Sequence, residues 1–365
     1  MNRLSAIRDD LATQWRRLGD RPGGVQLMEV CGTHTVAISR GGLRSLLPEG
    51  LRLISGPGCP VCVTDQSYID QAAYLARELT DVTIATYGDM VRVPGALGSL
   101  AEARSAGADV QVVSAAHEAV ALAARRPDRQ VIFLAVGFET TAPATALAVQ
   151  QARREGLGNF SVFTAHKLVL PAMRALLAQA DVRIDGFLCP GHVSVITGWK
   201  AYEPLAAEFR RPCVVAGFDD EQILTGIAEI LRQLAEGAPA AVSVYPPVRP
   251  EGNARAQEVM AEVFEVADAR WRALGAIPES GLELREAYAE FDAARRFKLP
   301  TFESHDPPGC RCGDVITGRC LPTDCALFAT ACTPRRPVGP CMVSSEGSCA
   351  AYYKYHHRQA GKEQA

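Results

Sequence analysis

The stretch QVIFLAVGFETTAPATALAVQQARREG, residues 130–156, decides the fold class. Its first part is an unbroken apolar run that predicts a strand buried on both faces, and residues 143–156 predict a helix after a short polar turn. Strand and helix in this order are the unit of a parallel sheet. The unit is repeated downstream, with strands expected at 160–166, 184–192 and 212–218 and helices at 170–180 and 220–237.

The same alternation precedes residue 125. Strands are expected at 25–30, 51–56, 81–88 and 109–114, with helices at 34–47, 67–79, 99–107 and 117–126. The polar segment RRPDRQ, residues 125–130, interrupts the pattern, so we place a domain boundary near residue 125. The sequence therefore predicts two parallel-sheet α/β domains, over residues 24–125 and 126–240.

The two ends of the chain differ from this pattern. Residues 1–20 predict an amphipathic helix with Leu4, Ile7, Leu11 and Trp15 on one face. Beyond Phe297 the chain is rich in proline, glycine and cysteine, so it cannot build a strong apolar core. A bound metal centre would supply the missing stability, and the N-terminal helix could pack on this third unit.

Composition excludes several classes of function. The 365 residues carry a formal charge of -3 without a basic cluster, so nucleic-acid binding has no support. The first 20 residues are charged throughout, which fits neither a signal peptide nor a membrane span. We therefore expect a cytoplasmic protein without membrane attachment. In that reducing compartment its 12 cysteines are expected to be metal ligands or redox thiols.

Cysteines are concentrated near the C-terminus, where the backbone is predicted to be irregular. A 4Fe-4S cluster needs four thiolates that converge from separate positions, which irregular backbone allows. Zinc sites favour closely paired cysteines, and only Cys310 and Cys312 are so close, so we favour iron–sulfur over zinc and both over disulfides. Seven residues compete for four places: Cys310, Cys312, Cys320, Cys325, Cys332, Cys341 and Cys349.

A second cysteine motif is GPGCPVC, residues 56–62, which follows a predicted strand. Its C-x-x-C spacing lets Cys59 and Cys62 form a disulfide or share a metal ion. The alternative is a turn in which two buried thiols only pack. Beside an iron–sulfur cluster, the redox interpretation is favoured.

A third motif is MEVCGTHT, residues 28–35, in which Cys31 and His34 follow the first predicted strand. Open α/β sheets bind ligands at the carboxyl edge of their strands. The two side chains could therefore bind one metal ion or act as nucleophile and base. The alternative is a capping turn in which Thr33 or Thr35 begins the helix.

Further polar turns follow other predicted strands, and together they suggest a cleft at the strand ends. The chain contains no phosphate-binding loop and no nucleophile elbow of a serine hydrolase. The polar turns that follow the predicted strands are YGDMVRVPG (Asp89, Arg92), GFETTAP (Glu139, Thr140, Thr141), AHK (His166) and PGHVSVITG (His192, Ser194).

Six motifs in this order resemble the HypD family of hydrogenase maturation proteins, over residues 8–357. They are MEVCGTHT, GPGCPVCVT, YGDMVRVPG, GFETTAP, PGHVSVITG and CMVSSEGSCAAYYKY. The resemblance implies two α/β domains plus a loop- and helix-rich iron–sulfur domain formed by both chain ends, here residues 1–23 and 241–365. It also implies a scaffold on which the Fe(CN)2CO unit of NiFe-hydrogenases is assembled with the HypC chaperone. Cyanide would come from HypE, which is supplied by HypF, and the iron would finally reach the hydrogenase large subunit.

The resemblance also assigns roles to individual residues. Cys31 would hold the iron together with HypC, and His34 would be a second ligand or a proton-handling group. Cys59 and Cys62 would pass electrons between the cluster and the iron. The family pattern C-x12-C-x6-C-x16-C fits Cys312, Cys325, Cys332 and Cys349 as cluster ligands and leaves Cys310, Cys320 and Cys341 over. Without that pattern, Cys341 is an alternative to Cys349.

Two other classes of function fit parts of the sequence. One is a stand-alone iron–sulfur thiol/disulfide oxidoreductase in which Cys59 and Cys62 are the active dithiol. Such an enzyme has no need of an isolated Cys31 beside His34, which favours the maturation scaffold, a role unlike that of a conventional turnover enzyme. The other is a zinc-stabilised binding protein, which metal analysis would separate from both.

Overall fold

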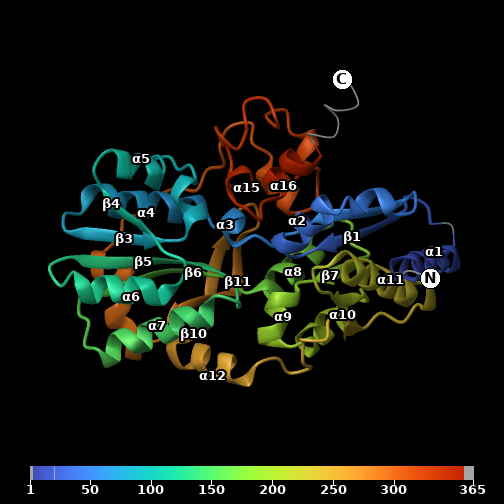
Figure 1. The fold of residues 1–365 in the computed structure, drawn as a ribbon, viewed down its shortest axis with the longest axis horizontal. Helices are drawn as coiled ribbons and strands as arrows, with labels where there is room; N and C mark the ends of the chain where they lie inside the picture. The colour runs from blue at the N-terminus through green and yellow to red at the C-terminus, as the bar shows by residue number, and fades with distance from the viewer. Residues whose placement is uncertain (1–2, 20, 357–365) are drawn as a thin grey trace.

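The computed structural model describes residues 3–19 and 21–356 and consists mainly of two parallel sheets with helices around them (Figure 1). The α/β class predicted from the sequence is confirmed. The five-stranded sheet has the order β2-β1-β7-β8-β9 and the four-stranded sheet the order β4-β3-β5-β6. The strands are β1 Val25–Glu29, β2 Leu51–Ser55, β3 Val82–Thr86, β4 Asp109–Val112, β5 Gln130–Gly137, β6 Phe160–His166, β7 Gly186–Cys189, β8 Cys213–Val215 and β9 Ala241–Ser243.

Helices follow most strands, as parallel connections require. The α-helices are α1 Arg3–Leu18, α2 Gly32–Arg40, α3 Pro60–Val63, α4 Gln66–Glu78, α5 Leu100–Ser105, α6 Ala116–Arg125, α7 Ala142–Arg154, α8 Val169–Leu177, α9 Gly191–Thr197, α10 Glu203–Phe209, α11 Asp220–Glu236, α12 Ala254–Val263, α13 Ala293–Phe297, α14 Cys312–Ile316, α15 Pro340–Val343 and α16 Ser348–Tyr355. Short 3-10 helices are η1 Leu43–Leu46, η2 Gly88–Arg92, η3 Lys200–Tyr202, η4 Glu286–Phe291 and η5 Pro322–Asp324. An antiparallel hairpin joins β10 Phe264–Trp271 to β11 Gly275–Leu284.

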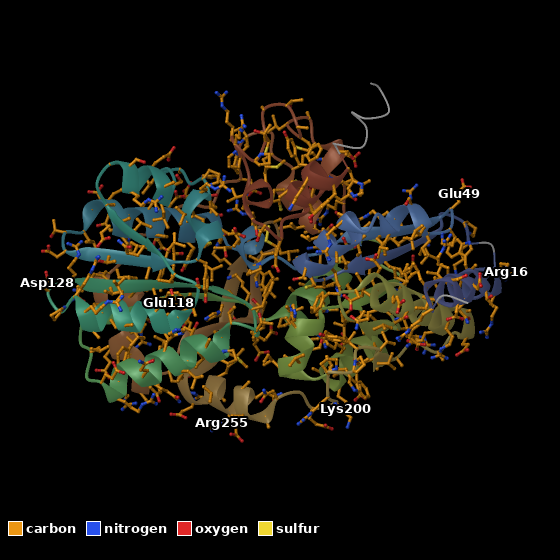
Figure 2. All side chains as sticks on the ribbon, in the orientation of Figure 1. Arg16, Glu49, Glu118, Asp128, Lys200 and Arg255 are labelled. Carbon is orange, nitrogen blue, oxygen red and sulfur yellow. A yellow bond between two sulfur atoms is a disulfide. The ribbon has the colours of Figure 1, made fainter. Side chains whose placement is uncertain are left out.

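Strand β5 shows why the apolar run at residues 130–137 is so informative. Val131 and Phe133 pack in one apolar cluster, which includes residues of α6 and α7. Ile132 and Leu134 point to the opposite face, into a cluster that includes residues of α4. All four are fully buried, so the strand is covered on both faces, as the sequence predicts. Charged residues such as Glu49, Asp128 and Arg255 lie on the outside of the molecule (Figure 2).

The sheets do not follow the division of the chain expected at residue 125. Strands β1 and β2 pair with β7, β8 and β9, whereas β3 and β4 pair with β5 and β6. The segment from β3 to β6 is therefore inserted into the chain that builds the five-stranded sheet. Partner choice between parallel strands depends on the tertiary structure, and adjacency in sequence predicted it wrongly here.

The N-terminal helix also lies elsewhere than expected. Helix α1 packs on α11, and its Leu11 belongs to the apolar cluster of the five-stranded sheet. Leu4, Ile7 and Trp15, the predicted apolar face, pack against the same cluster. A domain formed by both chain ends is therefore not what the described residues show: α1 covers the α/β unit.

Part of the C-terminal third also belongs to the α/β units. Strand β9 completes the five-stranded sheet, α12 packs on α7, and β11 contacts β6. Residues 298–356 remain as a separate, cysteine-rich segment. In Figure 1 this segment, drawn in red, lies above the region between the two sheets. One apolar cluster joins all three parts, since it includes Met28, Ile132 and Cys341.

Candidate functional site

Cys31 lies at the carboxyl end of β1, at the N-cap of α2, and is 9% exposed. In the five-stranded sheet β1 lies between β2 and β7, so the chain continues from β1 to β2 on one side and later adds β7 on the other. Open α/β sheets form binding crevices at such a change of direction, at the carboxyl ends of the strands. Burial raises the pKa of the Cys31 thiol to about 11, and the nearby Glu346 carboxylate acts in the same direction. The thiol is therefore protonated at neutral pH unless a cation displaces the proton.

His34 is fully buried one turn further along. Its Nε2 atom lies 2.9 Å from the Gly217 carbonyl oxygen, and burial lowers the pKa of the imidazole to about 4. The neutral ring carries its proton on Nε2, because this atom faces a carbonyl acceptor. Among the described residues, Nδ1 has no hydrogen-bonding partner, so its lone pair is available.

The C-x-x-C motif begins helix α3. Cys59 is the N-cap residue of this helix, and a disulfide joins it to Cys62. The two residues are 5% and 0% exposed. The sequence predicted a redox or metal-binding pair, and the structure shows that the spacing closes a disulfide within the core of the molecule.

The turns that carry Cys31 and Cys59 lie against each other. The Gly32 amide donates to the Gly58 carbonyl at 2.9 Å. A Cβ atom on Gly58 would lie 2.3 Å from the Cys31 nitrogen and 2.5 Å from its Cα. Only a glycine permits this approach of two backbones, which brings the two cysteine-bearing turns into one site.

We predict that Gly58→Ala separates these turns and destabilises the fold by about 1–3 kcal/mol. The added methyl group meets backbone atoms, which cannot rotate away. Urea unfolding of the variant and maturation in a complemented strain would both be measured. Gly158→Ala is the matched control, because a Cβ at Gly158 meets nothing within 4 Å. Equal stability of the two variants would contradict the prediction.

The loop at residues 344–347 covers these turns and connects them to the other sheet. Thr33 donates from its hydroxyl to Glu346 at 2.7 Å. On the other side of the loop, Asp89 accepts hydrogen bonds from the Ser345 amide and hydroxyl, both at 2.8 Å. The motifs of Cys31 and Asp89 are thus joined through the C-terminal segment. Sequence reasoning did not single out Glu346, and only its place within CMVSSEGSC pointed to it.

Six of the seven C-terminal cysteines surround one hollow, which we call the cysteine hollow. Cys312 and Cys341 are in contact there, with their sulfur atoms 2.7 Å apart. Cys320 is the exception and lines a groove beside β2. The hollow is lined by Cys310, Cys312, Cys325, Cys332, Cys341 and Cys349, together with Arg311, Leu327, Phe328, Gly339 and Met342.

Electrostatics differ among the thiols of the hollow. The contact with Cys341 lowers the pKa of Cys312, and the positive charge of Arg272 adds to this effect. Burial raises the pKa of Cys310 to about 12 and also raises that of Cys332. Within the described residues, no group of three or more ligating side chains is arranged to hold a single metal ion.

The other predicted turns have mainly structural contacts. Ser194 donates to the Pro190 carbonyl and contacts the Tyr202 hydroxyl, and His166 contacts Thr145. Glu139 differs, because it is 4% exposed and burial raises the pKa of its carboxyl to about 7. One of its oxygens accepts from the Val169 amide, and the other has no partner in the described chain.

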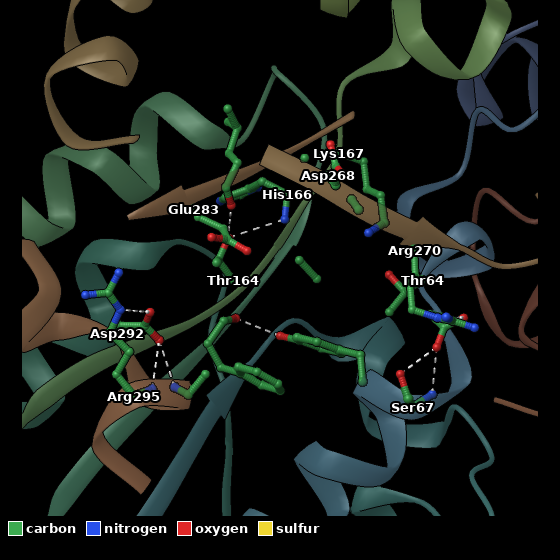
Figure 3. A pocket seen from close by; sticks show the side chains of 18 residues that line it. Thr64, Ser67, Thr164, His166, Lys167, Asp268, Arg270, Glu283, Asp292 and Arg295 are labelled. Carbon is green, nitrogen blue, oxygen red and sulfur yellow. Dashed lines mark hydrogen bonds and ion pairs between the residues drawn. The ribbon is translucent and has the colours of Figure 1, made fainter. Parts of the chain in front are cut away.

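A further pocket, of about 400 Å³, lies where α4, β6 and the β10–β11 hairpin meet (Figure 3). Its wall includes Lys167, which is 5% exposed and whose pKa burial lowers to about 8. Thr64 and Arg270 line the same pocket. Thr64 directly follows the C-x-x-C helix α3, and Arg270 lies near the end of β10. No cysteine in the part of the chain that the structure describes lines this pocket.

Within residues 3–19 and 21–356, no helix is long and apolar enough to cross a membrane. Comparison with known proteins adds the family. A family model named HypD, described as the hydrogenase formation hypA family, matches residues 6–356.

Several curated proteins are similar to this chain over most of their length. The hydrogenase maturation factor HypD of Rhizobium leguminosarum is 45% identical over 362 residues, which cover 97% of this chain and 94% of that protein. HypD of Escherichia coli is 44% identical over 343 residues, with 93% and 91% covered. HypD of Azotobacter vinelandii is 46% identical over 344 residues, with 92% and 90% covered. With a match of this extent, the chain belongs to the HypD family of hydrogenase maturation factors.

Proposed function

We propose that this chain is the scaffold on which the Fe(CN)2CO unit of a NiFe-hydrogenase is assembled. HypC would share the iron with it, HypE would deliver cyanide made with HypF, and the hydrogenase large subunit would receive the product. The observation that carries the proposal is the backbone contact between the turns of Cys31 and Cys59. This contact brings the isolated Cys31 thiol close to the Cys59–Cys62 pair, which supports a shared site. In the proposal the pair is redox-active and the chain works in the cytoplasm, where thiols are reducible.

The iron is the cargo of this site. Low-spin iron with cyanide and carbon monoxide is soft and electron-rich, so a thiolate suits it better than a carboxylate does. Cys31 would supply that thiolate after losing its proton. The His34 ring is neutral, and its Nδ1 lone pair has no partner among the described residues, so it can be donated to iron or take up a proton.

The cysteine hollow fits a 4Fe-4S cluster. Six thiols converge on it, three from the short helices α14, α15 and α16 and three from irregular backbone, whereas structural zinc sites use close tetrahedral sets. The family spacing assigns Cys312, Cys325, Cys332 and Cys349 as its ligands. Such a cluster supplies one electron at a time at a low potential. Opening the Cys59–Cys62 disulfide consumes two electrons and two protons and yields two thiols.

Iron binding at Cys31 should depend on pH in one direction. The folded-state pKa of this thiol is raised to about 11, so below that pH each bound iron must displace one proton. The pKa of His34 is about 4, so its ring releases no proton above pH 5. We expect ferrous-iron affinity to rise about tenfold per pH unit between pH 6 and 8. Anaerobic titrations at three pH values would measure this slope, and an affinity independent of pH would contradict it.

The proposal is tested by anaerobic co-purification with HypC, followed by iron, sulfide and zinc analysis and infrared spectroscopy. Roughly four irons and four sulfides per chain, with infrared bands of iron-bound cyanide and carbon monoxide when HypE is present, are expected. Zinc alone would overturn it.

The second candidate is a stand-alone thiol/disulfide oxidoreductase. Its support is the Cys59–Cys62 disulfide itself. The two cysteines are 5% and 0% exposed, so a disulfide substrate could reach them only after the site opens. A disulfide-reductase assay without HypC separates the candidates, because the scaffold should show no turnover in it.

A further inference from the structure

Arg272, directly after β10, is almost completely buried, with 3% of its surface exposed. It holds the residues that follow Cys62 on one side. Its backbone amide donates to the Val63 carbonyl at 2.9 Å, and its Nε donates to the Thr64 carbonyl at 3.2 Å. A third bond runs from the guanidinium to the Gln66 side chain at 3.0 Å.

The other side of Arg272 faces the chain segment that contains Asp306 and leads to the first cysteines of the cysteine hollow. Its guanidinium forms an ion pair with Asp306 at 2.8 Å. The next residue, Ala273, packs against Gly313: a Cβ on Gly313 would lie 2.7 Å from the Ala273 Cβ and 3.5 Å from an Asp306 oxygen. Gly313 follows Cys312, so Arg272 lies where helix α3 meets the hollow.

The ion pair is asymmetric in its exposure. The Arg272 side chain is 2% exposed, whereas that of Asp306 is 44% exposed. Water screens the carboxylate, but the guanidinium acts through the protein interior, where the effective dielectric constant is low. The positive charge therefore dominates on the side of the hollow.

We infer that Arg272 is a positioning residue that favours electron storage at the cysteine hollow and fixes the C-x-x-C helix against it. This inference rests on the proposed function, because it concerns the cluster that the hollow would hold. Each added electron makes such a cluster more negative, and a buried cation nearby raises its reduction potential. The same side chain binds Thr64 and Gln66, which follow Cys62, so charge and position are set together.

The test compares cluster midpoint potentials, measured by anaerobic redox titration with electron paramagnetic resonance. Arg272→Gln removes the charge and should shift the potential to more negative values. Asp306→Asn removes the counter-charge and should shift it in the opposite direction. Loosening of the fold alone cannot produce shifts of opposite sign. Arg272→Lys keeps the charge and should remain closer to the wild type than Arg272→Gln.

Arg270→Gln is the matched control. Arg270 lies two residues earlier on β10, with a side chain 63% exposed, and its loss should leave the potential unchanged. Iron and sulfide are counted in every sample. A wild-type chain that holds no cluster would overturn the proposed function and this inference with it. A cluster whose potential is the same in Arg272→Gln, or shifts the same way in Asp306→Asn, would overturn the inference alone. If the Arg272→Gln variant holds no cluster, the direction of the potential shift in Asp306→Asn decides whether the inference stands.

Discussion

Replacing Cys31 by Ser should abolish hydrogenase maturation while leaving the fold intact. A serine hydroxyl is a hard, weakly acidic ligand, so it cannot replace the thiolate that we propose for the iron. We expect hydrogenase activity in a strain complemented with the variant to fall by more than about 100-fold. Infrared bands of iron-bound cyanide and carbon monoxide should disappear from the HypC complex.

The position of Cys31 makes this variant informative. It is the N-cap residue of α2, and its sulfur makes no capping bond there. Serine is a favoured residue at an N-cap, so the unfolding free energy should change by less than about 1 kcal/mol. Thermal unfolding and circular dichroism would check this. Cys320→Ser, outside the cysteine hollow, should mature hydrogenase normally. Full maturation by Cys31→Ser would remove the proposed iron ligand.

Local structure was the part of the fold that the sequence predicted well. The apolar run at β5 alternates between two buried faces, and a helix follows it, so sequence periodicity and structure agree. The pairing of strands was not predictable in this way. Val25–Glu29 and Gly186–Cys189 are neighbours in one sheet although more than 150 residues separate them. Nothing in either segment encodes that partner, because every buried parallel strand carries the same apolar pattern.

The amphipathic N-terminal helix and the hairpin illustrate two further limits. An apolar face shows that a helix packs, but not on what, and α1 packs on α11. The hairpin has the weakest signal, because β10 is mostly exposed and carries charged residues such as Glu265 and Arg270. Its importance comes from its end, where Arg272 meets α3. A single arginine directly after a charged, exposed strand gives no sign of burial in the sequence.

The sequence predicted part of how the candidate site residues lie relative to one another, and it missed the part that depends on tertiary contacts. The turns of Cys31 and Cys59 both follow strands of the five-stranded sheet, so their meeting follows from the rule for carboxyl ends. The approach of Gly58 to Cys31 and the cover by Glu346 depend on tertiary contacts. The cysteine hollow itself shows the same limit, since spacing cannot say which six of seven thiols converge.

Cys332→Ala should remove the cluster, which gives the second large effect. Cys332 lines the hollow and its sulfur accepts a hydrogen bond from the Val338 amide at 3.3 Å, which fixes its direction. A cluster that loses one of four thiolates is expected to fall from roughly four irons per chain to below one. Iron, sulfide and the visible spectrum would be measured after anaerobic purification. Cys320→Ala is the control and should keep its iron.

The ligand set is decided by a pair of variants. The family spacing selects Cys349 and leaves Cys341 over, yet the Cys341 sulfur lies 2.7 Å from that of Cys312. We expect Cys349→Ala to lose its iron and Cys341→Ala to keep it. Packing of Cys341 against Cys312 then orients a ligand without bonding the metal. The reverse result would transfer the fourth position to Cys341, and unchanged iron in Cys332→Ala would overturn the assignment as a whole.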